Sequence, residues 1–317
     1  MKLRVAFQMD RIDNINIDQD TTFRLAEKAQ ELNHEIFYYN PENLFFSEGK
    51  VFAKGHYLTI NRDKKNFFNL HNKITIDLEK DFDVIWLRQD PPFDMAYITS
   101  THLLDLVSKK TLVINDPFWV RNLPEKIFVL SFADLTPPTL ISKNVEEIKV
   151  FLNEHKKIVI KPLFGNGGAD VFKVNISDPN LNSILEVFNQ KYKEPFIIQK
   201  FLSEIKNGDK RVILVDGKPV GAINRLPQKG EIRSNMHVGG IAKKTNLTVR
   251  DKEICQKIGN ILKKRGQLLV GIDIIGDFLT EINLTSPTGI QEIEKYENID
   301  ISQKIWDVIT KKVKMLN

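Results

Sequence analysis

The stretch GIDIIGDFLTEINLTSPTG, residues 271–289, places two carboxylates and an amide on a predicted β-hairpin. Asp273 lies in one apolar strand, and Glu281 and Asn283 lie in the next. Carboxylate and amide oxygens are the hard ligands that Mg²⁺ prefers, and such apolar strands would bury these groups unless something pairs them. The hairpin therefore predicts a metal site at Asp273, Glu281 and Asn283, with a solvated hairpin face as the alternative.

The predicted site requires one register of this hairpin. Glu281 and Asn283 share a face of their strand, because side chains alternate between faces. A two-residue turn at Gly276-Asp277 would put Asp273 on the opposite face. A three-residue loop, Gly276 to Phe278, would set Asp273 directly across from Glu281, and glycine tolerates the positive φ of such loops. We expect the three-residue loop.

Composition limits the class of protein. The 317 residues, 42% hydrophobic and 27% charged, describe a soluble, enzyme-like chain of two or three domains. The net charge of +5 comes from lysines scattered in short pairs among acids, without a basic helix or arm. We therefore expect small anionic substrates and no nucleic acid. No apolar run approaches the roughly 18 residues of a membrane span, so no membrane partner is expected.

Cysteine and histidine usage favour a cytoplasmic protein without a transition-metal centre. The single cysteine, Cys255, excludes an internal disulfide and fits a reducing compartment. Isoleucines at helical spacing around Cys255 predict a role in helix packing. The six histidines show no metal-ligand spacing, and the motifs HExxH, CxxC and GxSxG are absent.

Residues 1–122 alternate strands and helices. This order predicts an α/β domain with a small, doubly wound parallel sheet and an inserted hairpin over residues 45–60. The expected elements are strands at 3–9, 34–39, 83–88 and 111–114 and helices at 20–32 and 94–107.

The pattern becomes antiparallel after the Pro137-Pro138 break, so that the whole chain is α+β. We expect a second unit over residues 123–200 and a third over residues 201–317. The expected elements are a helix from Asn144 to His155, strands at 157–161, 171–174 and 196–200, and a hairpin that turns at Asp216-Gly217.

A glycine loop, LFGNGGADVF at 163–172, lies between two of these strands. Gly165, Gly167 and Gly168 would let backbone N–H groups approach phosphate closely. The loop lacks the Gly-Lys-Ser/Thr of a Walker loop and the GxGxxG of dinucleotide sites, so a plain hairpin turn is the alternative. Lys161, at the preceding strand end, favours an anion site, because a buried lysine requires an anionic partner.

Further cations are expected in the same cleft. Arg211 and Arg225 lie on the two strands of the Asp216-Gly217 hairpin, in apolar stretches, and guanidinium groups suit multidentate contacts with oxyanions. Lys126 is a further candidate. The polar segment from Leu226 to Gly240 predicts a lid, with Arg233 as its charged tip. Each arginine taken alone could be a surface residue.

Two segments complete the expected site. Gln199, Lys200, Phe201 and Leu202 end a strand and would supply backbone groups to a flat heteroaromatic base. Arg88 ends a strand of the first sheet, where ligands of open α/β sheets bind, and would hold a substrate carboxylate. The alternative for residues 199–202 is an ordinary strand end, and the alternative for Arg88 is a salt-bridged loop arginine.

Read together, these segments closely resemble the prokaryotic-type glutathione synthetases of the ATP-grasp superfamily, in order and essentially end to end. The matching stretches are MD-x4-IN at 9–16, LRQDPPFD at 87–94, IND at 114–116, PEK at 124–126, SFADLTPPTL at 131–140, IKPL-x-GNGG at 160–168, NGDKRV at 207–212, GEIRSNMHVGG at 230–240 and the stretch from 271 to 294.

The resemblance implies an ATP-grasp fold with an N-terminal pre-ATP-grasp domain and a lid subdomain. It implies a ligase that joins γ-glutamylcysteine to glycine through an acyl phosphate and releases ADP and phosphate. It further implies ATP, Mg²⁺ with Mn²⁺ as the alternative metal, and a homo-oligomer. The roles it implies are metal binding by Asp273, Glu281 and Asn283; nucleotide binding by Lys126, Lys161, Gly165, Gly167, Gly168, Gln199, Lys200, Phe201, Leu202 and Asp209; stabilisation of the reacting groups by Arg211, Arg225 and Arg233; and peptide binding by Arg88, Asn283, Ser286 and Thr288.

The chain departs from the family at three places. Gln89 stands where lysine is common, Phe164 stands where an acid is common, and the cysteine often found near Gly289 is missing. These departures leave the predicted metal and arginine sets intact, so they bear on substrate detail and not on reaction type. Another ATP-grasp carboxylate–amine ligase and a catalytically silent nucleotide-binding module are the alternatives.

Overall fold

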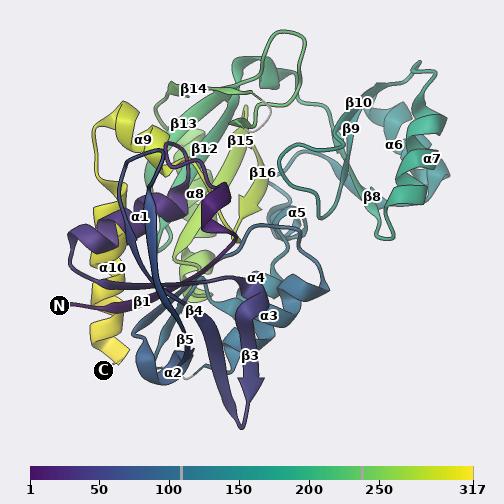
Figure 1. Ribbon diagram of the computed structural model, residues 1–317. Helices are drawn as coiled ribbons and strands as arrows, with labels where there is room; N and C mark the ends of the chain where they lie inside the picture. Colours follow the sequence, from purple (N-terminus) through teal and green to yellow (C-terminus); the bar gives the residue numbers. More distant parts are fainter. Residues whose placement is uncertain (108–109, 237–238, 317) are drawn as a thin grey trace.

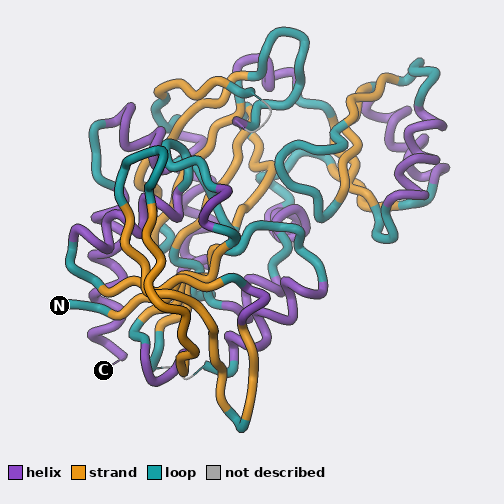
Figure 2. The backbone as a smooth tube through the Cα atoms, viewed as in Figure 1, coloured by secondary structure: helices purple, strands orange, loops and turns teal. Residues whose placement is uncertain are grey.

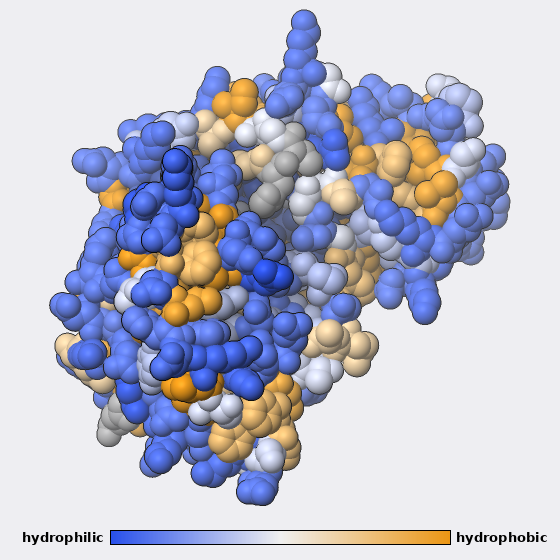
Figure 3. Space-filling model, viewed as in Figure 1, coloured by the Kyte–Doolittle hydropathy of each residue, from blue (hydrophilic) through white to orange (hydrophobic). Residues whose placement is uncertain are grey.

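Three β-sheets follow one another along the chain, and helices pack against them (Figure 1). The computed structural model describes residues 1–107, 110–236 and 239–316. The first and third sheets belong to one body, and the second stands to one side as a separate lobe (Figure 2). Hydrophilic residues cover most of the face in Figure 3. Within the described ranges, no helix is both long and apolar enough to cross a membrane.

The first sheet has the strand order β3-β4-β2-β1-β6-β7, with β5 paired to β4. Strands β2, β1, β6 and β7 are parallel, as predicted. The predicted hairpin over residues 45–60 is confirmed as β3 and β4, and it extends the sheet because β4 pairs antiparallel with β2, β3 and β5. Strand β5, which is mostly exposed and polar, was not predicted. The strands are β1 Arg4–Met9, β2 Glu35–Tyr39, β3 Leu44–Ser47, β4 Lys50–Ile60, β5 Phe68–Asp77, β6 Val84–Arg88 and β7 Leu112–Ile114.

Short helices connect the strands of the first sheet. Asp20 caps the helix α1 by accepting the N–H of Phe23, and Asp94 caps α3 by accepting the N–H of Tyr97. Both caps fall within a residue of the predicted helix starts. The helices are η1 Ile12–Asn14, α1 Thr21–Glu31, η2 Pro41–Asn43, α2 Leu78–Asp81, α3 Met95–Asp105 and α4 Pro117–Asn122.

The lobe is built on the second sheet, of order β10-β9-β11-β8, which is antiparallel as predicted. Two helices cover one face and close a separate hydrophobic core, in which Phe188 contacts Phe196 at 5.0 Å between ring centroids. Asn144 caps the first of these helices by accepting two N–H groups, which confirms its predicted start. The elements are β8 Thr139–Ser142, α6 Val145–His155, β9 Lys157–Pro162, β10 Phe172–Asn175, α7 Leu181–Lys191 and β11 Phe196–Lys200.

The third sheet has the order β14-β13-β12-β15-β16 and is antiparallel throughout. One face packs against α8, α5 and η3, and Phe128, Phe132 and Leu135 belong to that core. The other face packs against α9 and α10. The elements are α5 Glu125–Phe128, η3 Val129–Phe132, η4 Ser203–Asn207, β12 Asp209–Val215, β13 Lys218–Leu226, β14 Ile241–Lys244, α8 Val249–Lys264, β15 Leu269–Ile275, β16 Phe278–Asn283, α9 Ile290–Glu297 and α10 Ile301–Leu316.

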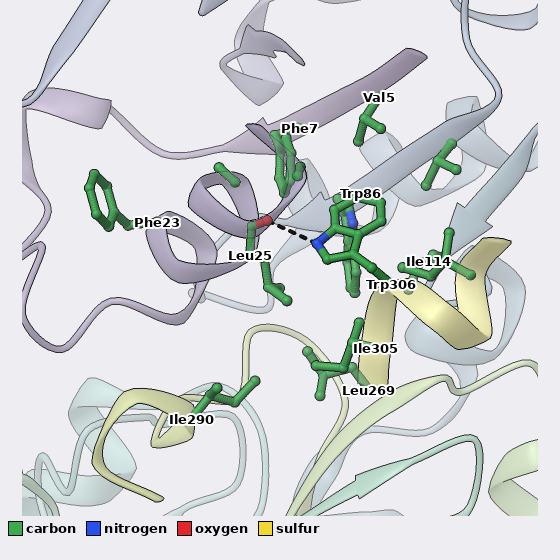
Figure 4. Packing of buried hydrophobic residues seen from close by; sticks show 14 of the residues in the cluster. Val5, Phe7, Phe23, Leu25, Trp86, Ile114, Leu269, Ile290, Ile305 and Trp306 are labelled. Atoms are coloured by element: carbon green, nitrogen blue, oxygen red, sulfur yellow. Dashed lines mark hydrogen bonds between the residues drawn. The ribbon is translucent and has the colours of Figure 1, made fainter. Parts of the chain in front are cut away.

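The last helix joins the first and third sheets. Trp306 of α10 lies in one cluster with Trp86 of the first sheet and Leu269 of the third, and its Nε1 donates to the carbonyl of Leu25 at 3.0 Å (Figure 4). The two sheets therefore share a hydrophobic core, so packing fixes them relative to each other. The division into residues 1–122, 123–200 and 201–317 stays a prediction.

Candidate active site

One cleft of about 790 Å³ lies among the three sheets. Its wall contains every site residue predicted from the sequence except Arg88. The residues brought together are Lys126, Lys161, Gly165, Gly167, Gly168, Gln199, Lys200, Phe201, Leu202, Asp209, Arg211, Arg225, Arg233, Asp273, Glu281, Asn283, Ser286 and Thr288.

The β15–β16 hairpin sets Asp273 directly across from Glu281, as predicted. The predicted three-residue loop is wrong, since Ile275 pairs with Phe278 across a two-residue turn. A β-bulge next to Asp273 leaves Thr280 as the extra residue of β16 and corrects the register. Thr280 Oγ1 donates to the carbonyl of Asp273 at 3.1 Å, which holds the bulge in place.

Two arginines and two aspartates form a chain of ion pairs on the cleft wall. Arg211 donates from Nε and Nη2 to the two oxygens of Asp273, at 2.6 and 3.0 Å. Arg225 Nη2 lies 2.9 Å from Asp273 and 2.5 Å from Asp209. Neighbouring strands supply these residues, because Arg211 is the cross-strand partner of Asp273 and Asp209 that of Arg225. All four side chains are less than 10% exposed.

The pKa values of the two aspartates are shifted in opposite directions. Burial alone would raise the pKa of Asp273, but the charges of Arg211 and Arg225 hold it below the ordinary value. Burial raises the pKa of Asp209 to about 6, against the attraction of Arg225 and with a contribution from the nearby charge of Asp273. Among the described residues, Asp209 Oδ1 and Arg225 Nε are buried without a hydrogen-bond partner. An acceptor and a donor therefore remain unsatisfied by the described residues at this wall.

Two lysines converge on Glu281. Lys126 of α5 lies 3.8 Å and Lys161 of β9 lies 3.5 Å from Glu281 Oε1. Burial lowers the pKa of Lys161, an effect that Glu281 opposes and Lys126 reinforces. Lys126 also donates to the carbonyl of Gly165. This arrangement of two cations at one carboxylate can hold a polyanion with a metal ion beside it.

The glycine loop needs its glycines for different reasons. A Cβ on Gly165 would lie 2.3 Å from Pro162 Cγ, and Gly167 and Gly168 have φ of +64° and +79°. Arg233 of the predicted lid donates from Nη1 to the carbonyl of Gly168 at 3.2 Å. The lid and the glycine loop therefore meet above the cleft. Residues 237 and 238 of the predicted lid lie outside the described residues.

The predicted base-binding segment, residues 199–202, already makes hydrogen bonds to other residues of the lobe. Gln199 is buried, and its Nε2 donates to Thr139 Oγ1 at 3.1 Å. The N–H groups of Lys200 and Phe201 donate to the carbonyls of Pro138 and Lys157, at 3.0 and 2.9 Å. Those two N–H donors are therefore not available to a heteroaromatic base.

Arg88 lies behind the cleft wall and not on it. Its Nε donates to Thr22 Oγ1 at 2.9 Å, and its Nη2 donates to the carbonyl of Pro287 at 3.2 Å. Arg211 Nη1 donates to the carbonyl of Thr288, at 3.3 Å. Two arginines thus fix the Ser286 to Thr288 loop by its backbone, which leaves the side chains of that loop on the cleft wall.

The sequence-based reasoning missed an acidic wall of the cleft. Asp10 follows β1, Asp90 follows the neighbouring β6, and Asp20 caps α1. Asp10 Oδ2 accepts the N–H of Asp90 at 2.7 Å, and burial followed by the charge of Asp90 raises the pKa of Asp10. The rule that ligands bind beyond the carboxyl ends of parallel strands, which was applied to Arg88, could have found Asp10 and Asp90. Such a wall suits an ammonium group.

The chain is similar to known proteins over nearly its whole length. The families described as prokaryotic glutathione synthetase, N-terminal domain, and prokaryotic glutathione synthetase, ATP-grasp domain, match residues 3–121 and 125–298. The glutathione synthetase of Mesorhizobium japonicum is 51% identical over 314 residues, which cover 99% of this chain and 100% of that protein. That of Agrobacterium fabrum is 53% identical over 308 residues, with 97% and 96% covered. That of Escherichia coli is 40% identical over 309 residues, with 97% and 98% covered.

Solved structures share the fold at low sequence identity. D-cycloserine synthetase DcsG is 13% identical, with a TM-score of 0.67 over 99% of this chain and 100% of that chain. The ATP-grasp ligase PsnB, complexed with minimal precursor, Mg and ADP, is 15% identical, with a TM-score of 0.62 over 98% of both chains. These likenesses confirm the ATP-grasp fold and say nothing further about the ligands of this cleft.

Proposed function

The chain belongs to the prokaryotic glutathione synthetase family, and from this premise we propose that it joins γ-glutamylcysteine to glycine and converts ATP to ADP and phosphate, with the γ-phosphoryl group passing first to the peptide carboxylate. The observation that carries the proposal is the ion-pair chain Asp209–Arg225–Asp273–Arg211, which lies in the same cleft as Lys126. A carboxylate is a poor electrophile, so the reaction needs phosphoryl transfer and neutralisation of anionic charge. Buried cations supply that neutralisation without a covalent nucleophile.

Two carboxylates and an amide oxygen are ligands of the kind that a divalent cation prefers, and both Asp273 oxygens also accept from Arg211. Asp273, Glu281 and Asn283 present carboxylate and amide groups on one wall. Asn283 Nδ2 donates to the carbonyl of Gly271 at 3.2 Å, which leaves the amide oxygen for a ligand. Mg²⁺, or Mn²⁺ in its place, would neutralise phosphate charge when bound there. The hard oxygen ligands favour these ions over softer metals.

The cations divide between the nucleotide and the reacting groups. Lys126 and Lys161 would hold the nucleotide phosphates, with the N–H groups of the glycine loop above them. Arg211 and Arg225 would hold the transferred phosphoryl group and the acyl phosphate. The buried Nε of Arg225 supports this role, because it is a donor on a charged group for which no described residue provides an acceptor. Asp209, with an unpartnered oxygen, would accept from the ribose.

The remaining walls would receive the peptide and the amino acid. Ser286 and Thr288 would contact the peptide, on a loop that Arg88 holds from behind. Asp10 and Asp90 would receive an ammonium group. The lid, with Arg233 at the glycine loop, would exclude water from the acyl phosphate.

Two broader properties belong to the same proposal. Resemblance to the family supports a homo-oligomer, which sedimentation equilibrium tests. The single buried cysteine is compatible with a cytoplasmic, reducing location, which fractionation of the source cells tests.

The direct test is ADP release with Mg-ATP, γ-glutamylcysteine and glycine, and with each omitted in turn. We expect release that depends on all three, formation of glutathione in equal amount, and loss of both with Glu281→Gln. Release that depends on another amine or carboxylate would retain ligase chemistry and overturn the substrate assignment. ATP binding without turnover for any substrate pair would instead favour a catalytically silent module.

A further inference from the structure

The lobe meets the rest of the cleft through contacts that a nucleotide would disturb. Its hydrophobic core contains only residues between 140 and 198, so that core does not fix the lobe against the other two sheets. Among the described residues, three polar contacts reach across: Lys126 with the carbonyl of Gly165, Arg233 with the carbonyl of Gly168, and Lys161 with Glu281. Two of them use lysines that the proposed function assigns to the nucleotide phosphates, and the third uses the arginine of the proposed lid. None of the three is therefore a fixed anchor.

An aromatic contact joins the lobe to the first domain without using those cations. Phe164, directly before Gly165, stacks on Phe93 with ring centroids 5.9 Å apart and an interplanar angle of 22°. In the part of the chain that the structure describes, this is the one ring-to-ring contact between the lobe and the rest. The hollow left at this seam measures about 20 Å³, and Leu123 and Leu163 border it beside the two rings. The two rings and these leucines thus form an apolar part of the seam, next to the polar residues Glu125, Lys126, Asn166 and Thr285.

Phe93 is a fixed support for this contact. Its ring lies 5.2 Å from that of Tyr97, which is fully buried in the core of the first domain. Asp94, the next residue, caps α3 by accepting the N–H of Tyr97 at 2.9 Å. Pro91 and Pro92 restrict the preceding backbone. The position of Phe93 therefore follows from the fold of the first domain.

Phe164 is connected to the glycine loop by a short, tightly turned backbone, so its position limits where the loop can lie. Leu163 is buried, and Gly165 lies so close to Pro162 that even a Cβ would not fit. The backbone from Pro162 to Gly165 is thus a tight turn, and Gly167 and Gly168 follow directly.

We propose that Phe164 is a positioning residue for the nucleotide: stacked on Phe93, it holds the glycine loop over the phosphate end of the cleft before a nucleotide arrives. Binding then requires less ordering of the loop. The inference rests on the proposed function in taking the ligand to be a nucleoside triphosphate with a divalent cation. It does not depend on which amide the enzyme makes.

Calorimetric titration with AMP-PNP and Mg²⁺ tests the proposal, because it measures nucleotide binding without turnover. We expect Phe164→Ala and Phe93→Ala each to weaken binding about two- to tenfold, the range for one aromatic pair. The double variant should bind AMP-PNP no more weakly than the single variant with the lower affinity, because both changes remove the same contact. Phe164→Tyr keeps the ring and should bind like the unmodified chain. The matched control is Phe45→Ala, which removes another stacked ring, 5.5 Å from Phe52.

Steady-state kinetics separates positioning from general damage. We expect Phe164→Ala to raise the KM for ATP while kcat and the KM values of the other two substrates stay unchanged. Unchanged AMP-PNP affinity in Phe164→Ala, additive losses in the double variant, or an equal rise of all three KM values with a lowered Tm would overturn the proposal. If Phe93→Ala fails to fold, the comparison of Phe164→Ala with Phe164→Tyr decides.

The same titration distinguishes failure of this inference from failure of the proposed function. An unmodified chain that binds AMP-PNP but forms no glutathione would overturn the proposed function and leave the positioning role standing if the variants behave as expected. A chain that does not bind AMP-PNP would overturn both.

Discussion

Arg225 connects Asp209 to Asp273: its Nη2 lies 2.5 Å from one carboxylate and 2.9 Å from the other. The ordering of the cleft and the stability of the third sheet therefore depend on the same buried charges. A substitution in this row of ion pairs changes both the order of the cleft and the stability of the sheet. Experiments must therefore measure activity and stability separately.

Asp273→Asn should abolish activity and also destabilise the protein. It leaves the guanidinium groups of Arg211 and Arg225 buried without their shared carboxylate, at a cost of about 3–5 kcal/mol. Glu281→Gln should lower ATP turnover about a hundredfold or more while changing stability by less than about 1 kcal/mol, since Glu281 is partly exposed. Thermal unfolding and ADP release check both variants. Asp277→Asn, in the exposed turn of the same hairpin, is the control, and full activity of Glu281→Gln would contradict the metal assignment.

Trp306→Ala should destabilise the chain by about 3–5 kcal/mol, because it removes a fully buried indole that contacts two sheets. The hydrogen bond from Nε1 to the carbonyl of Leu25 is lost as well. Urea unfolding measures the change. Met315→Ala, on the same helix and 85% exposed, should shift stability by no more than about 0.5 kcal/mol. Equal effects of the two substitutions would contradict a shared core.

Cys255 should react with thiol reagents at pH 8 only when the protein unfolds. Burial, and then the charge of Asp251, raises the pKa of its thiol to about 12. An acid whose pKa is raised in the folded state costs stability once the unfolded chain ionises, so stability should fall as pH rises from about 8.5 toward 12. Labelling rates in urea, compared with unfolding rates, check the first statement. Cys255→Ala should reduce the fall in the free energy of unfolding between about pH 8.5 and about 12. Rapid labelling of the folded protein would contradict the burial of Cys255.

Asp300 should stabilise the junction between α1 and α10 only above acidic pH. Burial opposes its ionisation, but Lys28 at 2.9 Å and neighbouring hydrogen bonds hold the pKa of Asp300 at about 2. A lowered pKa contributes stability that is present above the unfolded value near 3.9 and is lost as pH falls toward 2.

The variant Asp300→Asn should therefore lower the Tm at pH 7, and its difference from the unmodified chain should shrink as pH falls below about 4. The effect should stay under about 1 kcal/mol, because the side chain is 43% exposed and screened by solvent. Asp307→Asn, an exposed position on the same helix, is the control. A difference that does not change with pH would contradict the ion pair.

Local sequence patterns predicted some elements well and others poorly. The cap at Asn144 and the hairpin at Asp216-Gly217 were predicted correctly, because capping and turn residues act over a few positions. The face of Asp273 was predicted correctly for the wrong reason: the turn has two residues, and a bulge at Thr280 restores the register. A bulge depends on the neighbouring strand, which a turn motif does not specify.

The sequence by itself determined the family, the ATP-grasp fold and the set of polar residues that the cleft contains, because those follow from motifs and periodicities along the chain. Only the tertiary structure decided how these residues are used. It placed Arg88 behind the wall, added Asp10 and Asp90 to the wall, and stacked Phe164 on Phe93. Such relations join residues far apart in the chain, and they depend on how the three sheets pack, which no local pattern records.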